Sequence, residues 1–322
     1  MLDIITIGSA TIDTFITTDV KTLKIKTKKD NQEYIALPYG SKILINKLQH
    51  HTGGGGTNTA VTFAKAGLKT GFLGSIGKDH DGREIQSELR KKNIKFLGTI
   101  HGTTGHSTIL DVDQDRTILT YKGCNDKIPL EFKKAKKLRA KWFYIASVTE
   151  KMFSLTKEII KFPKNNKTKI CFNPSSYIAR KGLKYIHTIL KNTYCLILND
   201  EEAELLTGHN EIKENLKTLS KNIIFDGIVV ITAGKKNAYA YDSRKIYSLK
   251  PKEDIKIKET TGAGDAFASG FVLGLIKKQS IPICMKMGMI NSEHTIQHLG
   301  AKEGLLGNNL LHLASLDKRI VK

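Results

Sequence analysis

The chain has 322 residues, of which 40% are hydrophobic and 26% charged, a composition that excludes a disordered protein. Its net charge is +21, but lysine runs such as Lys21–Lys29 and Lys133–Lys141 have no interleaved aromatic residues and no nucleic-acid-binding signature. No apolar run is long enough to span a membrane, and the first residues lack the pattern of a signal peptide. We therefore expect a cytoplasmic protein with a solvated basic surface that binds neither nucleic acid nor membrane.

Short apolar runs alternate with amphipathic stretches along most of the chain. The apolar runs, which are typical of buried parallel strands, are Ile4–Ile7, Gly71–Ile76, Trp142–Ala146, Ile170–Phe172, Cys195–Leu198 and Ile228–Ile231. The helical patterns are Thr57–Lys65, Asp81–Lys92, Ser154–Lys161, Ala179–Leu190 and Ile212–Asn222. This alternation predicts a three-layer, Rossmann-like α/β core.

Two segments, residues 14–52 and 104–122, carry strand patterns without helices. Their strands are predicted at Lys42–Leu48 and in a hairpin of Ser107–Val112 and Thr117–Tyr121, joined by a turn at Asp113–Arg116. They predict a small β-sheet lid, built from two excursions out of one domain that spans residues 1–322. Because the strands alternate apolar and polar residues, one face can cover a substrate while the other pairs with a second copy. We expect a homodimer through the lid.

A run of small residues stands between the first excursion and the helical pattern that follows it. Gly53 to Gly56 are four glycines, which allow the backbone to pack tightly against a ligand. Asn58 supplies both a donor and an acceptor, which suits the vicinal hydroxyls of a sugar. A flexible loop is the alternative interpretation. The Walker motif and the Gly-x-Gly-x-x-Gly motif are absent, which disfavours a P-loop NTPase and a Rossmann dehydrogenase.

A second small-residue stretch leads from a loop into an apolar helix near residue 265. Gly262, Ala263 and Gly264 leave the N–H groups of the helix start bare, and such a helix start binds anions. A carboxylate at Asp265 would repel a phosphate there unless it served as the base for a substrate hydroxyl. From these residues alone, the alternative interpretation is an ordinary glycine-rich turn in which Asp265 caps the helix.

Together these two stretches resemble the signatures of the ribokinase-like (PfkB) carbohydrate kinase family. The pattern Gly-Gly-x-x-x-Asn-x-Ala is met by Gly53, Gly54, Asn58 and Ala60, and Thr-x-Gly-Ala-Gly-Asp-x-Phe is met by Thr260, Gly262, Ala263, Gly264, Asp265 and Phe267. Further matches keep their order over nearly the whole chain, including Gly8-Ser9, Asp13, Asn173-Pro174, the Asn199 to Glu204 run and Thr232-Ala233-Gly234.

The resemblance implies a role for each matching residue. Asp265 would be the catalytic base, and Gly262, Ala263 and Gly264 would form the anion hole. The substrate hydroxyls would be held by Asp13, Gly54 and Asn58. The nucleotide and its Mg²⁺ would be held by Asn199, Thr232, Gly234 and Asn291, with Glu202 as the metal residue. Asn199 and Glu202 could instead simply cap a helix that begins at Asp200.

The resemblance implies an ATP-dependent, Mg²⁺-requiring kinase that phosphorylates a hydroxyl of a small sugar. A nucleoside kinase on the same fold is the alternative, and a non-catalytic nucleic-acid binder is disfavoured because the base and the anion hole are both present. The lid residues that could face a nucleoside base are Ile109, Leu110, Ile118, Leu119 and Tyr121. Only Tyr121 among them is aromatic, and a nucleoside needs a flat surface for its base, which favours a free sugar.

The chain departs from the family pattern at three places. Glu259 stands where the family commonly has Asp, so we expect weak or absent activation by K⁺. Asn237 replaces the second glycine of a Gly-x-x-Gly loop on the ATP side and tolerates positive φ less readily. The lysine-rich stretch between Asp19 and Lys42 lengthens the first lid excursion.

Overall fold

The computed structural model describes the 322-residue chain except residues 19–36, 113–114, 127–137 and 161–167. The run Lys21–Lys29 and most of Lys133–Lys141 therefore lie outside the described residues. In the part of the chain that is described, no helix is long and apolar enough to cross a lipid bilayer.

The core is a nine-stranded sheet in the order β15-β14-β13-β12-β11-β10-β1-β4-β6. Its strands are β1 (Leu2–Ile7), β4 (Thr70–Leu73), β6 (Lys95–Phe96), β10 (Ala140–Ile145), β11 (Lys169–Phe172), β12 (Cys195–Asn199), β13 (Ile228–Thr232), β14 (Ala238–Tyr241) and β15 (Ile246–Leu249). The strands from β13 to β6 are parallel, whereas β14 and β15 add an antiparallel edge. The carboxyl ends of the parallel strands therefore meet along one rim, where α/β proteins place their ligands.

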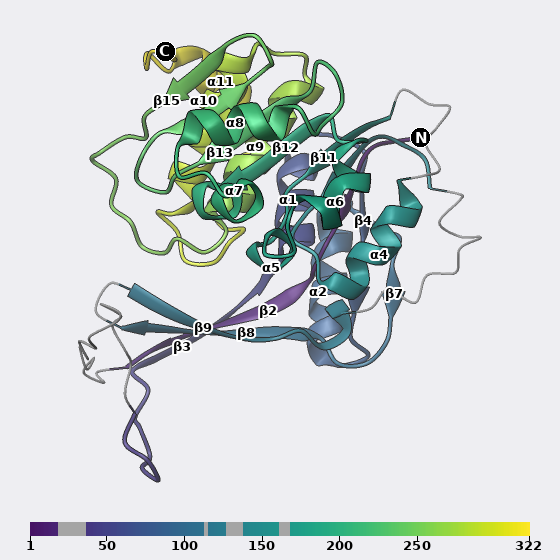
Figure 1. Ribbon diagram of the computed structural model, residues 1–322. Helices are drawn as coiled ribbons and strands as arrows, with labels where there is room; N and C mark the ends of the chain where they lie inside the picture. The colour runs from purple at the N-terminus through teal and green to yellow at the C-terminus, as the bar shows by residue number, and fades with distance from the viewer. Residues whose placement is uncertain (19–36, 113–114, 127–137, 161–167) are drawn as a thin grey trace.

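Helices cover both faces of this sheet because its strands are apolar on both sides. Ile5 and Ile7 face one helical layer, and Ile4 faces the other. The first layer is α4 (Glu150–Ile159), α5 (Ser176–Ala179), α6 (Leu183–Leu190), α7 (Asp200–Thr207) and α8 (Ile212–Ser220). The second is α1 (Gly55–Lys65), α9 (Ala263–Ile276), α10 (Ile281–Thr295) and α11 (Leu310–Leu316), and α2 (His80–Lys91) packs beside α1. The predicted three-layer α/β fold is confirmed (Figure 1).

Two predicted elements are each divided in the structure. Of the predicted helix Ala179–Leu190, only Ala179, which ends α5, and the residues of α6 are helical, because Gly182 adopts a left-handed φ of 80° between the two helices. The predicted strand Gly71–Ile76 is β4 followed by β5 (Ser75–Ile76). β5 leaves the main sheet and pairs with β7 (Thr99–Ile100).

A second sheet, which we call the lid sheet, projects from the core (Figure 1). It has four strands in the order β3 (Lys47–Gly53), β2 (Thr11–Thr17), β8 (Gly105–Val112) and β9 (Asp115–Tyr121), and η1 (Gly123–Asp126) follows it. The predicted hairpin is present, with β9 beginning at Asp115 inside the predicted turn. That residues 1–322 form one domain with this lid stays a prediction.

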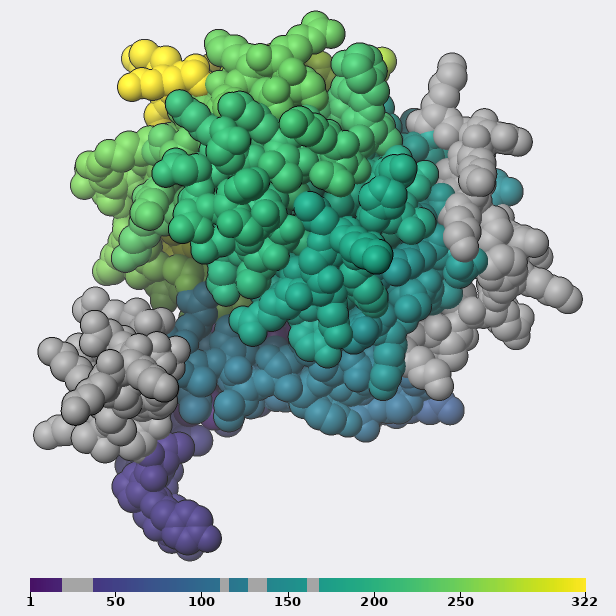
Figure 2. Space-filling model, in the orientation of Figure 1, coloured from purple at the N-terminus to yellow at the C-terminus, as the bar shows by residue number. Residues whose placement is uncertain are grey.

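The strand predicted at Lys42–Leu48 is wrong, because the strand that pairs with β2 is Lys47–Gly53. Its sequence, KLQHHTG, is mostly polar, so its position depends on pairing with β2 and not on an apolar pattern. Residues 37–46 instead form an extended arm that projects beyond the lid sheet, visible in purple at the lower left of Figure 2.

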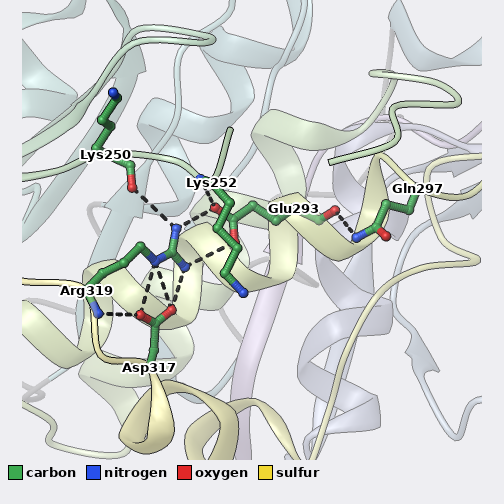
Figure 3. Close-up of polar contacts among 6 residues, drawn as sticks. All are labelled: Lys250, Lys252, Glu293, Gln297, Asp317 and Arg319. Atoms are coloured by element: carbon green, nitrogen blue, oxygen red, sulfur yellow. Dashed lines mark hydrogen bonds and ion pairs between the residues drawn. The ribbon is translucent and has the colours of Figure 1, made fainter. Parts of the chain in front are cut away.

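A buried ion cluster fixes the C-terminal tail and the segment that leads toward α9 (Figure 3). Arg319 contacts Glu293 of α10 at 2.5 Å and Asp317 at 2.6 Å, and the backbone N–H of Lys252 donates to Glu293 at 2.8 Å. The cluster joins the chain after β15 to α10. It therefore holds one end of the loop that enters the candidate site.

Candidate active site

Asp13 lies on β2, where the lid sheet meets the core. Its side chain is buried, and Oδ1 accepts a hydrogen bond of 3.0 Å from the hydroxyl of Thr11. A Cβ atom on Gly53 would lie 1.9 Å from Oδ2 of Asp13, so only glycine fits beside this carboxylate. Burial raises the pKa of Asp13, although hydrogen bonds from Thr11 and Ser107 lower it in part.

Gly54 is the N-cap of α1 and has a φ of 95°, a conformation that favours glycine. A Cβ atom there would lie 2.6 Å from the carbonyl oxygen of Ser9, so the helix start packs directly against the loop after β1. The resulting position of α1 brings Asn58 into the site.

Asn58 joins the two motifs that the sequence places at opposite ends of the chain. Its Nδ2 donates a hydrogen bond of 2.8 Å to Oδ2 of Asp265. The Oδ1 atom is buried and has no hydrogen-bond partner among the described residues. A buried, unpaired carbonyl costs free energy unless it accepts a hydrogen bond, so this atom is suited to a ligand hydroxyl.

Asp265 lies in the first turn of α9, which spans 14 residues. The N-cap is Gly262, with a φ of 82°, and no side chain within the described part of the chain caps the helix start. A Cβ on Gly262 would lie 2.5 Å from that of Ala301, so glycine is required at this close approach. Bare N–H groups at a helix N-terminus favour an anion, and Gly264 leaves space for one.

The carboxyl of Asp265 is easier to protonate than an ordinary Asp. Burial raises its pKa most, and the negative charge of Asp13 raises it further. The hydrogen bond from Asn58 and the positive charge of Lys302 act in the opposite direction. A carboxylate with a raised pKa is a stronger proton acceptor once it is ionised, as a general base requires.

Two cavities at the carboxyl rim of the sheet share Ser147, Ser175 and Asp265. The larger, of about 820 Å³, extends under the lid sheet and is lined by Asp13, Gly54, Asn58 and Gly262 among others. The smaller, of about 240 Å³, is lined by Asn199, Glu202, Thr232 and Gly264. Asp265 therefore stands where the two cavities meet.

Asn199 and Glu202 form a capping box at the start of α7. The backbone N–H of Glu202 donates to Oδ1 of Asn199 at 2.7 Å, and that of Asn199 donates to Oε2 of Glu202 at 3.0 Å. Ser176 also donates to Glu202, whose pKa is raised because the carboxyl is buried. The capping interpretation is thus correct, and the same two residues also line the smaller cavity, with Thr232 opposite Asn199 on β13.

Gly234 and Asn291 do not line either cavity. Gly234 follows β13 in a turn with a φ of 53°, and Asn237, in the same turn, does not adopt positive φ. The assignment of Asn291 to the nucleotide stays a prediction. The Asn291 side chain is fully buried, donates to the carbonyl of Ala266 and accepts from the N–H of Leu306, so it holds α9 against α10.

An ion pair between a buried lysine and a partly buried glutamate lies near Asp13, and no sequence pattern indicated it. Nζ of Lys302 contacts Oε2 of Glu88 at 2.7 Å and the hydroxyl of Thr52 at 3.1 Å, with the lysine side chain 4% exposed. Burial lowers the pKa of Lys302, whereas Glu88 and Asp13 raise it in part. No short motif contains these residues, because three separate segments supply them.

Two tyrosines and an ion pair at the site also come from separate segments. Tyr121 at the end of β9 and Tyr177 on α5 line the larger cavity. Arg116 of β9 lies 3.3 Å from the buried carboxylate of Glu259, immediately before the Thr260–Asp265 turn. The expectation that K⁺ activates weakly because of Glu259 stays a prediction.

Among the described residues, no group of three or more His, Cys, Asp or Glu side chains could enclose a metal ion. A metal at this site would therefore need most of its ligands from substrate oxygens and water. Glu202 supplies a carboxylate to the smaller cavity, which Asp265 also lines, and few protein ligands suit a hard cation such as Mg²⁺, since this ion keeps several waters in such sites.

Comparisons with known proteins agree with this geometry. A family model described as pfkB family carbohydrate kinase matches residues 4–306. A ribokinase from Lactococcus lactis is 29% identical over 259 residues, which cover 79% of this chain and 82% of that protein. A cytidine kinase from Thermococcus kodakarensis is 26% identical over 315 residues, which cover 93% of this chain and 98% of that protein.

Solved structures share the fold at lower identity. A nucleoside kinase from Methanocaldococcus jannaschii aligns with a TM-score of 0.76 and 19% identity over 98% of both chains. A ribokinase from Arabidopsis thaliana, complexed with ribose and ATP, aligns with a TM-score of 0.75 and 18% identity over 97% of this chain and 98% of that one.

Proposed function

Because the chain belongs to the pfkB family of carbohydrate kinases, we propose that it is an ATP-dependent kinase that transfers the γ-phosphoryl group to a hydroxyl of a small sugar. The proposal depends most on the position of Asp265, at the junction of the two cavities and in the first turn of a helix without a side-chain cap. A carboxylate at that junction can take a proton from a substrate hydroxyl on one side, and the phosphoryl group to be transferred lies on the other.

In this proposal Asp265 takes the proton from the acceptor hydroxyl. The hydroxyl oxygen then bonds to the γ-phosphorus, the bond from that phosphorus to the bridging oxygen breaks, and ADP leaves. The N–H groups of Gly262, Ala263 and Gly264 at the start of α9 stabilise the charge on the transferring phosphoryl group. The lid sheet keeps water out of the larger cavity, which limits hydrolysis.

Substrate hydroxyls are assigned to Asp13, Gly54 and Asn58. The unpaired Oδ1 of Asn58 accepts from one hydroxyl, and the carboxylate of Asp13 accepts from a neighbouring one. Asn199, Thr232 and Gly234 are assigned to the nucleotide, of which the first two line the smaller cavity.

Glu202 is assigned to Mg²⁺. When bound, the ion neutralises phosphate charge. The carboxylate of Glu202 already accepts hydrogen bonds from Asn199 and Ser176, which fix its orientation toward the smaller cavity.

A nucleoside is the second candidate substrate, and the lining of the larger cavity favours it more than the sequence did. Tyr177 joins Tyr121 along this cavity, together with Ile118, Val148 and Met152. A volume of about 820 Å³ also exceeds what a single pentose ring needs. The preference for a sugar depended on Tyr121 as the one aromatic residue among the five lid candidates, so Tyr177 weakens that argument.

The test is release of ADP by the full-length protein with ribose, fructose, 2-keto-3-deoxygluconate, adenosine, inosine or cytidine at equal concentrations. A sugar with the highest kcat/KM supports the proposal. A nucleoside that exceeds every sugar by about 100-fold, or about 2.7 kcal/mol of transition-state binding, shows that the base is bound and selects the second candidate. No ADP release above the acceptor-free rate with any of the six contradicts both.

A further inference from the structure

The lid sheet joins the core at one end, through its own strands. At that end, Thr11 of β2 pairs with Gly53 of β3 and with Gly105 of β8, beside the loop after β1. The opposite end is the β8–β9 hairpin, where Val112 pairs with Asp115. A sheet held at one end rotates about that end unless a contact fixes the other.

Arg116 supplies such a contact at the hairpin end. It is the second residue of β9, and its Nη1 lies 3.3 Å from Oε1 of Glu259 in the core. In the pleat of β9 it has the same parity as Ile118 and Thr120, both of which line the larger cavity. Its side chain therefore extends on the cavity side of the lid sheet.

Glu259 is built into the turn that precedes the helix start. Its Oε1 accepts from the N–H of Thr260 and the N–H of Thr261 at 2.7 Å each, and from the hydroxyl of Thr261 at 2.8 Å. The carboxylate is only 5% exposed, whereas the guanidinium is 30% exposed. A buried negative charge three residues before the N-cap would weaken anion binding at α9 unless a cation neutralised it.

From these contacts we propose that Arg116 is a positioning residue that links lid closure to the phosphoryl site. When the lid sheet lies over the acceptor, its guanidinium pairs with Glu259, fixes the free end of the sheet and neutralises the charge beside the anion-binding turn. When the lid opens, both effects are lost together. The site is therefore fully assembled only with the acceptor enclosed. This inference rests on the proposed kinase function.

The test is a double-mutant cycle of Arg116→Ala and Glu259→Gln in the full-length protein. The glutamine side chain keeps an oxygen that can accept from Thr260 and Thr261, so this substitution removes the charge and spares the turn. We expect Arg116→Ala to lower acceptor kcat/KM about 10-fold in the wild-type background and less than about 2-fold in the Glu259→Gln background. Additive losses, or an unchanged kcat/KM in Arg116→Ala, would overturn the proposal.

Two variants separate positioning from general effects on the lid. Arg116→Lys keeps a cation and should recover most of the loss, which a purely steric role would not predict. Lys47→Ala removes a different positive charge from the lid sheet, on β3, and should leave kcat/KM within about 2-fold of wild type. Equal losses in Lys47→Ala and Arg116→Ala would show a nonspecific charge effect.

Hydrogen exchange gives a readout that does not depend on turnover. Amides of β8 and β9 should exchange faster in Arg116→Ala and Glu259→Gln than in wild type or Lys47→Ala, with core amides unchanged. Wild-type exchange in both variants contradicts the link even if no acceptor is found. Faster exchange in a protein that releases no ADP with any acceptor would leave the link intact and reject the kinase proposal instead.

Discussion

Nδ2 of Asn58 donates a hydrogen bond of 2.8 Å to Oδ2 of Asp265, joining two residues that are 207 positions apart in the chain. The bond places the start of α1 against the start of α9 and fixes one carboxylate oxygen of Asp265. The other oxygen is left for the acceptor.

Asp265→Asn should lower kcat at least ~10²-fold because it removes the proposed base, with nucleotide affinity little changed. Steady-state kinetics and nucleotide titration measure both quantities. Asp242→Asn, in the β14–β15 turn away from both cavities, is the control. A kcat near that of wild type would remove Asp265 from the mechanism.

The same substitution should raise the melting temperature at pH 8. Burial raises the pKa of Asp265 in the folded state, so its ionised form destabilises the fold above the ordinary Asp value of 3.8. This cost decreases as the pH falls through the raised pKa, because the folded carboxyl then takes up a proton. The difference in melting temperature from wild type should therefore narrow in acid, and a variant less stable than wild type at pH 8 would contradict the prediction.

Asn58→Ala should move the acidic limb of the kcat/KM profile to higher pH. The hydrogen bond from Asn58 lowers the pKa of Asp265, so its loss leaves burial and Asp13 to raise that pKa further. The control is Asn215→Ala on α8, another buried asparagine, bonded to Thr207 and remote from both cavities. An acidic limb that stays in place or moves to lower pH would refute the assignment.

Lys302→Met should destabilise the fold by about 3–5 kcal/mol, because it leaves the partly buried carboxylate of Glu88 unpaired. Urea denaturation measures the loss, which the double variant Glu88→Gln/Lys302→Met should reduce. Although burial raises the pKa of Glu88, Lys302 and Thr52 lower it on balance. The stabilisation is therefore present above pH 4.5, the ordinary Glu value, and is lost as the pH falls through the lower folded pKa.

Removal of divalent cations should abolish phosphoryl transfer, and Mg²⁺ or Mn²⁺ should restore it. Glu202 offers a hard oxygen ligand in the smaller cavity, which Asp265 also lines. Activity is measured after EDTA treatment and after addition of each ion. Glu202→Gln should raise the Mg²⁺ concentration needed for half-maximal rate, and full activity in EDTA would refute a metal requirement.

The protein should be a homodimer through the outer face of the lid sheet. Leu48 and Leu119 are 53% and 56% exposed on the lid sheet, and apolar side chains in such a position favour burial against a second copy. Light scattering at ~50 µM should give twice the mass of the chain, and Leu48→Asp/Leu119→Asp should give the monomer mass. A wild-type monomer at that concentration contradicts the prediction.

Much of this fold was determined by local sequence. Apolar runs buried on both faces predicted β1, β10, β11, β12 and β13, and the glycines at 53–56 and at 262 and 264 predicted two helix starts that pack closely against other groups. These features can be predicted from the sequence because an apolar strand and a glycine with positive φ each involve only a few consecutive residues. The two small-residue stretches also indicated Asn58 and Asp265, whereas Asp13, Glu202 and Thr232 were expected only from the resemblance to the kinase family. All five line the two cavities.

Tertiary structure alone decided the partners of those residues. The polar strand β3 forms because β2 supplies its hydrogen bonds. Its sequence has no alternation of apolar and polar residues that would predict a strand. Lys302 meets Glu88, and Arg116 meets Glu259, only after the sheet has brought distant segments to one rim. Asn291 is a polar residue on a helix, and its neighbours in the sequence do not indicate burial. Packing nevertheless places its side chain in the interior between α9 and α10. Such pairings depend on the sheet order and helix packing of the folded chain, which no local pattern of residues encodes.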